Sequence, residues 1–207
     1  MKRLVPLTGV LGVALIIASF FVSGETPSTD DPVDEVVSFY LDNDSQIVWA
    51  SAILAWGGLA FLVFATVLRS ALRRAQGESG VATTLGFAGG IMFVAGVAIF
   101  AGIGFALGDA PEKMDPAAVQ ALNTLNSDLF FPLAIGQAAF LLGNGAAILS
   151  GGGLPRWLGW LAVVGGIISI TPIGFFVLAL TGIFVLASSV ILFSREGAAP
   201  AAGVGTP

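Results

Sequence analysis

The chain has 207 residues, of which 56% are hydrophobic and only 10% are charged, and its net charge is −5. A soluble domain carries about 25% charged residues, so these few charges cannot cover a water-exposed surface. The sequence contains no Cys and no His, which excludes disulfides, thiol nucleophiles, imidazole bases and the common zinc and haem ligand sets.

Six apolar segments follow one another along the chain. A helix needs about 20 residues to cross the hydrocarbon core of a bilayer, and most of these segments have close to that length. We therefore predict an all-α fold, a six-helix transmembrane bundle in one domain that covers residues 1–196. The predicted spans are residues 4–22, 47–68, 81–107, 129–149, 157–170 and 173–193.

The fifth segment is short, but the charges on either side of it support a helical hairpin. Arg156 and Arg195 enclose a stretch that is far too long for one span at about 1.5 Å per residue. Between them, Pro172 disfavours helix at the preceding residue and Gly174 permits a turn. A hairpin with its break at this point returns both arginines to the same side of the membrane.

The basic residues select an orientation. With the N-terminus inside, seven of the eight basic residues are cytoplasmic and Lys113 alone is outside, as the positive-inside rule requires. Eleven of the thirteen acidic residues then lie outside. We predict cytoplasmic N- and C-termini in a multi-pass protein of the plasma membrane. The first apolar run exceeds that of a typical signal peptide, so we expect a retained anchor. Residues 197–207, rich in Ala, Gly and Pro, should form a disordered tail.

Two outer loops carry the same start signal. Asp31-Pro32 and Asp115-Pro116 each match an Asp at the N-cap followed by Pro at the first helical position. The two pairs lie 84 residues apart, and each precedes a span, an arginine-bearing turn and a second span. We predict two short amphipathic helices on the outer face and raise the hypothesis of a parallel internal repeat. Two independently capped loop helices are the alternative.

Polar residues inside the spans are few. None of the six predicted spans contains Asp, Glu, Lys or Arg, which counts against a proton-coupled pump and, less strongly, against an ion channel. Gln137 and Asn144 lie seven residues apart and therefore share one face of the fourth span. This pair is our candidate intramembrane polar site. The two amides could line a cavity, or bond across helices and hold the bundle together, which is the interpretation we favour.

Three weaker features complete the survey. Gly86 and Gly90 form a small-xxx-small pair in the third span, which predicts close helix packing. Ser188 and Ser189 should bond their own helix backbone rather than act as nucleophiles. Arginines at the cytoplasmic ends of the spans could contact anionic lipid headgroups. These arginines are Arg69, Arg73, Arg74 and Arg156.

Two stretches carry a resemblance to a known family. Residues 154–161 have the sequence LPRWLGWL, and residues 68–75, LRSALRRA, lead into a Gly/Ala-rich helix. With these stretches the chain resembles a group of uncharacterised actinobacterial integral membrane proteins that are classified as a domain of unknown function. The resemblance extends from about Asp31 to Arg195. It implies a multi-pass protein in a Gram-positive plasma membrane, and it implies no activity, substrate or site residue.

The sequence indicates no catalytic, cofactor-binding or metal-binding residue, and we favour a non-enzymatic role. We interpret the chain as an accessory subunit or a binder of lipid or another apolar molecule. Its partners would be the lipid bilayer and, for a subunit, a membrane protein, but no nucleic acid. The alternative is a small transporter or channel for a neutral or apolar solute. That function requires a continuous cavity lined by Gln137, Asn144 and small residues.

The orientation predicts a labelling pattern in a chain that has no native cysteine. Ser38→Cys, in the first outer loop, should react with a membrane-impermeant thiol reagent in intact cells. Gln76→Cys should react only after the membrane is permeabilised, because the positive-inside rule places this turn in the cytoplasm. The reverse pattern would overturn the orientation.

Overall fold

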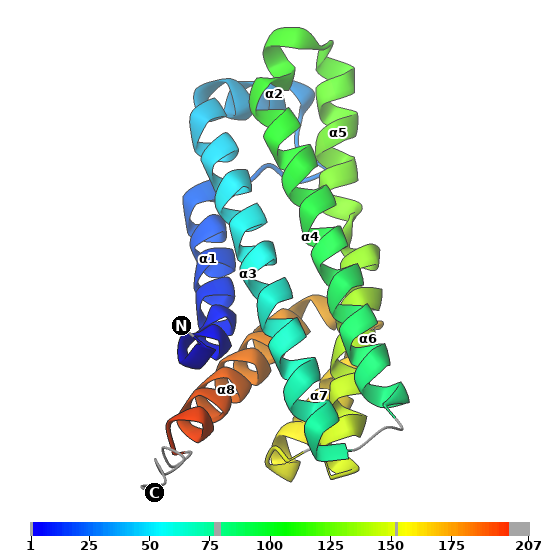
Figure 1. Cartoon of the computed structure of the whole chain (residues 1–207). Helices are drawn as coiled ribbons and strands as arrows, with labels where there is room; N and C mark the ends of the chain where they lie inside the picture. The colour runs from blue at the N-terminus through cyan, green and yellow to red at the C-terminus, as the bar shows by residue number, and fades with distance from the viewer. Residues whose placement is uncertain (1, 77–79, 152, 199–207) are drawn as a thin grey trace, which may run out of the picture.

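The computed structural model describes residues 2–76, 80–151 and 153–198. Within these residues the regular structure is helical, without a strand (Figure 1), which confirms the all-α prediction. In chain order the elements are the 3-10 helix η1 (Lys2–Leu7), α1 (Thr8–Ser23), α2 (Val33–Asp42), α3 (Asp44–Gln76), α4 (Val81–Lys113), α5 (Pro116–Asp128), α6 (Phe130–Leu149), α7 (Arg156–Ser169), the 3-10 helix η2 (Gly174–Phe176) and α8 (Val177–Ala198).

Five helical segments in the described residues are long and apolar enough to cross a membrane. They are Leu4–Ser23, Asp44–Ala75, Val81–Lys113, Pro116–Leu149 and Gly174–Arg195. The segment Arg156–Ser169, which is α7, is apolar but shorter. The structure therefore supports a multi-pass membrane protein, and the count of six spans stays a prediction.

Several helices continue past the predicted ends of the apolar segments. α3 ends at Gln76 rather than near residue 68, and α4 ends at Lys113 rather than near residue 107. Leu72 is fully buried, so the extension of α3 still packs an apolar side chain, and Arg73 lies on this helix instead of in a turn. α8 reaches Ala198, inside the predicted tail, and residues 199–207 lie outside the described residues.

The predicted hairpin forms between α7 and α8. Pro172 lies in the break between α7 and η2. At this end of the hairpin, the ring of Phe175 is centred 6.0 Å from the ring of Phe130, the first residue of α6. At the other end, the guanidinium of Arg195 donates a hydrogen bond to the carbonyl of Gly153, just before α7. The hairpin therefore extends along the whole length of α6.

Glycines bring α4 and α6 into backbone contact. A Cβ atom at Gly143 would lie 2.6 Å from the Cα of Gly86, and one at Gly86 would lie 2.9 Å from the backbone nitrogen of Asn144. Gly89 and Gly136 stand against the backbone of the facing helix in the same way. Small residues allow this approach in membranes, where van der Waals packing drives helix association. We call these four glycines the glycine seam.

Phenylalanine rings fill the centre of the bundle beside the seam. The ring of Phe61 on α3 is centred 5.0 Å from those of Phe93 on α4 and Phe140 on α6. The ring of Phe140 is in turn 5.9 Å from that of Phe184 on α8, edge to face. These tilted and edge-to-face arrangements are the favoured geometries for aromatic pairs. One aromatic layer therefore joins four helices.

A cap covers one end of the bundle, and we define it as α2, α5 and residues 24–32. In Figure 1, α2 and α5 lie at the top, beside the ends of α3 and α4. The Tyr40 hydroxyl donates a hydrogen bond of 2.7 Å to Oδ1 of Asn123 on α5. Nδ2 of Asn123 reaches the carbonyls of Pro27 and Ser28 at 3.4 Å. These bonds join the two cap helices to the connecting loop.

The two cap helices do not begin identically. Asp115 is the N-cap of α5 and Pro116 its first residue, as predicted. The N-cap of α2 is Pro32, so the prediction of Asp31 at that position was wrong by one residue. The carboxylate of Asp31 instead accepts a hydrogen bond of 2.7 Å from the backbone of Ser28, in the preceding turn. The internal repeat stays a prediction.

The glycine seam predicts a strong position dependence for one substitution. Gly143→Leu should lower the stability of the bundle by about 1–3 kcal/mol, the usual cost of overpacking. Gly102→Leu on α4 is the control, because nothing lies within 4 Å of a Cβ atom built there. Thermal unfolding in mild detergent measures the difference, and equal midpoints for the two variants would contradict the packing argument.

Candidate functional site

An apolar crevice opens between α1 and α8. Its volume is about 510 Å³, within the range of about 300–1,000 Å³ that is typical of ligand pockets. Phe61 and Phe93 of the aromatic layer line it, together with Ile17 of α1 and Ile183 of α8. Thr181 also lines it, but the hydroxyl of this residue donates to the carbonyl of Val177 on its own helix. The crevice therefore offers an apolar lining.

The crevice results from the divergence of α8 from α1. The helices are closest near Gly9, where an added Cβ atom would meet the Ser189 hydroxyl. Farther along, a Cβ atom at Gly182 would lie at an ordinary contact distance of 3.7 Å from the Val13 side chain. Figure 1 shows α8 running obliquely across the bundle while α1 stays near α3. Side chains therefore no longer meet toward the far end of α1.

The far end of the crevice is exposed at its rim. Phe175 is 55% exposed and Phe176 is 75% exposed, and both line the crevice. Rings with this exposure lie on the surface of a helix bundle that is apolar enough to be embedded in lipid. The opening of the crevice therefore lies on the apolar surface of the bundle.

Two smaller cavities continue from the crevice to the cap. The first has a volume of about 100 Å³ and shares Ile16 and Phe175 with the crevice. The second, which we call the chamber, has a volume of about 110 Å³ and shares Leu54 and Phe100 with the first. Phe20 lines all three. The three cavities therefore adjoin one another in series.

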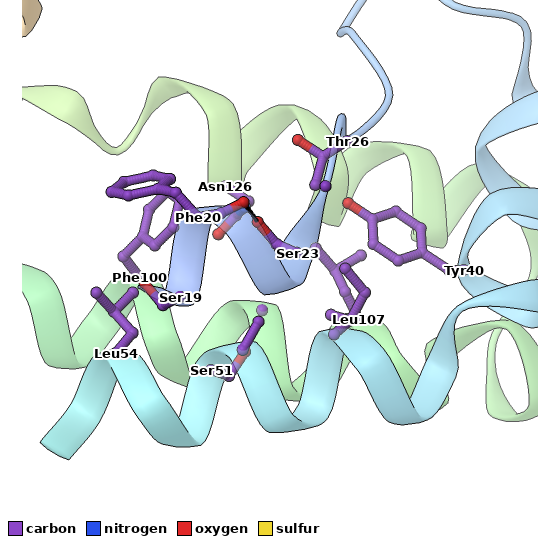
Figure 2. A pocket seen from close by; sticks show the side chains of 14 residues that line it. Ser19, Phe20, Ser23, Thr26, Tyr40, Ser51, Leu54, Phe100, Leu107 and Asn126 are labelled. Atoms are coloured by element: carbon purple, nitrogen blue, oxygen red, sulfur yellow. Dashed lines mark hydrogen bonds between the residues drawn. The ribbon is translucent and has the colours of Figure 1, made fainter. Parts of the chain in front are cut away.

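The chamber differs from the crevice in its lining. Figure 2 shows Ser51 entering it from α3 and Asn126 from the opposite side. Ser19 and Ser23 of α1 also line it, and their hydroxyls donate to carbonyls of their own helix. Its lining residues include no Asp, Glu, Lys or Arg. The chamber therefore adds several polar groups to a largely apolar lining, and none of them is charged.

Tyr40 adds a neutral hydroxyl to the chamber wall. It is 1% exposed and lines the chamber. Burial raises its pKa to about 12, because removing the phenolate from water disfavours the charged form. The side chain therefore stays protonated at physiological pH, and its proton is donated to Asn123.

The predicted intramembrane pair, Gln137 and Asn144, lies in the bundle interior. Gln137 is 0% exposed and Asn144 is 2% exposed. Nδ2 of Asn144 donates to the carbonyl of Phe140, one turn earlier on the same helix, at 2.8 Å. Neither amide atom of Gln137 has a hydrogen-bond partner within the described residues. Neither residue lines the crevice, the chamber or the cavity between them.

Buried hydroxyls on α8 add to this polar interior. Ser188 and Ser189 are fully buried, and neither hydroxyl has a partner in the part of the chain that the structure describes. The prediction that both would bond their own backbone was therefore wrong. Sequence analysis also assigned no role to Ser51 and Asn126. The residue type was the only property in the sequence that could have marked them, and it was not specific, because a lone Ser or Asn near a helix end is common.

The four predicted lipid-contact arginines lie at the bundle end opposite the cap. Arg73 and Arg74 on α3 are exposed, as is Arg156 at the start of α7. Arg69 is half-buried, with its guanidinium 4.7 Å from the ring centre of Phe87, a cation–π arrangement. The structure does not gather the four arginines around one point. Arg73, Arg74 and Arg156 are each exposed on the surface, whereas Arg69 is only partly exposed.

These features define a multi-pass α-helical membrane protein with a lateral apolar crevice and, at one end, an uncharged chamber whose lining is partly polar. Residues 6–200 match the family model described as a domain of unknown function, DUF4386. The chain therefore belongs to this family. No curated protein matches the chain, and no solved structure does.

The unpaired amide of Gln137 predicts a gain in stability on its removal. A buried polar group without a partner costs about 1–3 kcal/mol, so Gln137→Leu should raise the thermal midpoint in detergent by about 2–4 °C or more. Asn144→Leu is the comparison. It should lower the midpoint, because the backbone of α4 at Gly86 packs directly against the Asn144 side chain and leaves no room for a leucine. A Cβ atom built on Gly86 would lie only 2.7 Å from Nδ2 of Asn144. A lower midpoint for Gln137→Leu would show that the amide has a partner beyond the described side chains.

Proposed function

We propose that this protein binds a long-chain lipid that enters sideways from the bilayer through the crevice between α1 and α8. The observation that carries the proposal is the series of cavities, apolar at the exposed rim and partly polar beneath the cap. An alkyl chain gains nothing from water exclusion when it moves between lipid and an apolar crevice, since both are apolar. Selectivity then depends on the fit of the crevice and on the polar groups beneath the cap.

This proposal is favoured over the small transporter or channel. Transport would require a continuous cavity lined by Gln137 and Asn144, and neither residue lines any of the three cavities. The glycine seam fills the space on the α4 side of Asn144 with backbone. A binding site that is open to the side fits the distribution of space better than a path through the bundle. An accessory-subunit role would use the same site if the partner protein supplies or receives the lipid.

The proposal places the crevice in a six-span protein of the plasma membrane with both termini in the cytoplasm. The hairpin supports six spans, since Phe175 reaches the level of Phe130 while Arg195 returns to Gly153. The cap then lies outside, and Arg69, Arg73, Arg74 and Arg156 contact anionic headgroups of the inner leaflet, each contributing about 1 kcal/mol near a charged surface. An actinobacterial source belongs to the same proposal.

A bulky substitution in the crevice tests the proposal. Ala179→Phe should abolish co-purification of lipid and reduce binding of a fluorescent long-chain probe by about tenfold or more, because Ala179 is exposed and lines the crevice. Ala98→Phe on α4 is the matched control, since Ala98 is exposed but lines none of the three cavities. The measurement is lipid mass spectrometry and probe titration of the purified full-length protein.

Both variants should unfold at the temperature of the unsubstituted protein, because both positions are exposed. Equal probe binding by Ala179→Phe and Ala98→Phe would contradict the proposal. Loss of binding in both would mean that the probe reports general surface adsorption rather than the crevice.

A further inference from the structure

We infer that the chamber selects a neutral hydrogen-bonding head group, so that the preferred ligand is a long-chain alcohol or a neutral lipid with a free hydroxyl. This inference rests on the proposed function, because the alkyl chain of that ligand would occupy the crevice. It adds the chemistry of the head and the direction in which the ligand lies. The hydroxyl would face the cap, and the chain would extend toward Gly182.

The first argument is the presence of polar groups in the chamber whose bonding capacity is unused. Oδ1 of Asn126 is buried and has no hydrogen-bond partner within the described residues. The side chain of Ser51 is 7% exposed and lines the chamber, and its hydroxyl makes no hydrogen bond in the part of the chain described. A ligand hydroxyl can accept from Ser51, and it can donate to Oδ1 of Asn126 once that side chain turns toward the chamber, since a hydroxyl has both functions.

Three other hydroxyls of the chamber are already engaged as donors. The hydroxyls of Ser19 and Ser23 donate to Ile16 and Phe20, and that of Tyr40 donates to Asn123. This leaves the Asn126 amide and the hydroxyls of Ser51 and Thr26, for which the described residues supply no hydrogen-bond partner. A head group that only accepts hydrogen bonds would leave Oδ1 of Asn126 unpaired. A head group that only donates would leave the Ser51 proton unused.

The second argument is the charge around the chamber. No basic residue lines it, and the lone lysine at this end, Lys113, is paired with Asp109. Glu25 lies between Gly24 and Thr26, two residues of the lining. An anionic head group would lose its hydration without gaining a counter-ion, which is costly in a low-dielectric site. A cationic head group would likewise find no carboxylate in the lining.

The third argument is the space available to the head group. The chamber has a volume of about 110 Å³, several times the roughly 30 Å³ that one water occupies in the liquid. Gly104 lines it, and a Cβ atom there would lie 2.7 Å from the Ser51 hydroxyl. A side chain at position 104 would therefore occupy space beside the proposed donor. The chamber therefore has room for a small head group such as a hydroxyl.

The test compares ligands that share one alkyl chain and differ only in the head. The full-length protein in uncharged phosphatidylcholine nanodiscs is titrated with a long-chain alcohol, the corresponding hydrocarbon, the ionised carboxylic acid and the quaternary ammonium salt. Displacement of a fluorescent long-chain probe reports binding. The alcohol should bind about tenfold more tightly than the other three, the effect of two ordinary hydrogen bonds at roughly 0.5–1.5 kcal/mol each.

Two variants with matched controls isolate the head group. Ser51→Ala should weaken binding of the alcohol about threefold, the loss of one of the two hydrogen bonds, and leave binding of the hydrocarbon unchanged. Ser70→Ala on the same helix is its control, because the Ser70 hydroxyl is exposed and bonds its own backbone. Gly104→Val should fill the chamber with the same result. Gly102→Val, with open space around its Cβ position, should have no effect.

The outcomes separate this inference from the proposed function. If no ligand displaces the probe and Ala179→Phe has no effect, the crevice is not a binding site. If the hydrocarbon binds as tightly as the alcohol, or Ser51→Ala weakens both equally, the crevice binds chains but the chamber does not select a hydroxyl. Tightest binding of the carboxylate or the ammonium would overturn the neutral head group.

Discussion

Backbone contact between α4 and α6 is the constraint on which the rest of the bundle depends. The glycine seam leaves no side-chain volume between these helices, so the large residues of both must point elsewhere. Phe93 and Phe140 turn toward α3 and α8, where Phe61 and Phe184 complete one aromatic layer. In lipid, helices associate through close packing rather than through water exclusion. The seam and the layer beside it therefore replace the hydrophobic core of a soluble protein.

The same arrangement leaves α1 and α8 with an incomplete interface. Their close approach at Gly9 acts as the point of contact from which α8 diverges. The aromatic layer then forms the inner wall of the crevice instead of a buried contact, since Phe61 and Phe93 line it. Phe20 borders both this apolar space and the chamber beneath the cap. An interface that closed completely along α1 would leave no space for a ligand.

Buried polar groups occur in two environments with different consequences. Gln137 and Ser188 are fully enclosed in the bundle without protein partners, and an unpaired polar group in such a place is costly. Ser51 and Asn126 instead border a cavity, so a ligand can satisfy them. Asn126 lies on α5, the cap helix that Asn123 joins to Tyr40 and the connecting loop by hydrogen bonds, and Ser51 lies on α3.

The sequence by itself determined the class of protein, the positions of the helices and the hairpin break at Pro172. Length, hydropathy and start signals are local properties, and lipid requires each spanning segment to satisfy its own backbone. It also placed Gln137 and Asn144 in the interior, because an amide is costly in lipid. Only the tertiary structure decided where space remains. The crevice depends on the angle between α1 and α8, and the chamber joins residues from α1, α3 and α5 that are distant in the chain. The residue pattern of a single helix does not predict such a cavity, because its size and position depend on how several helices pack against one another.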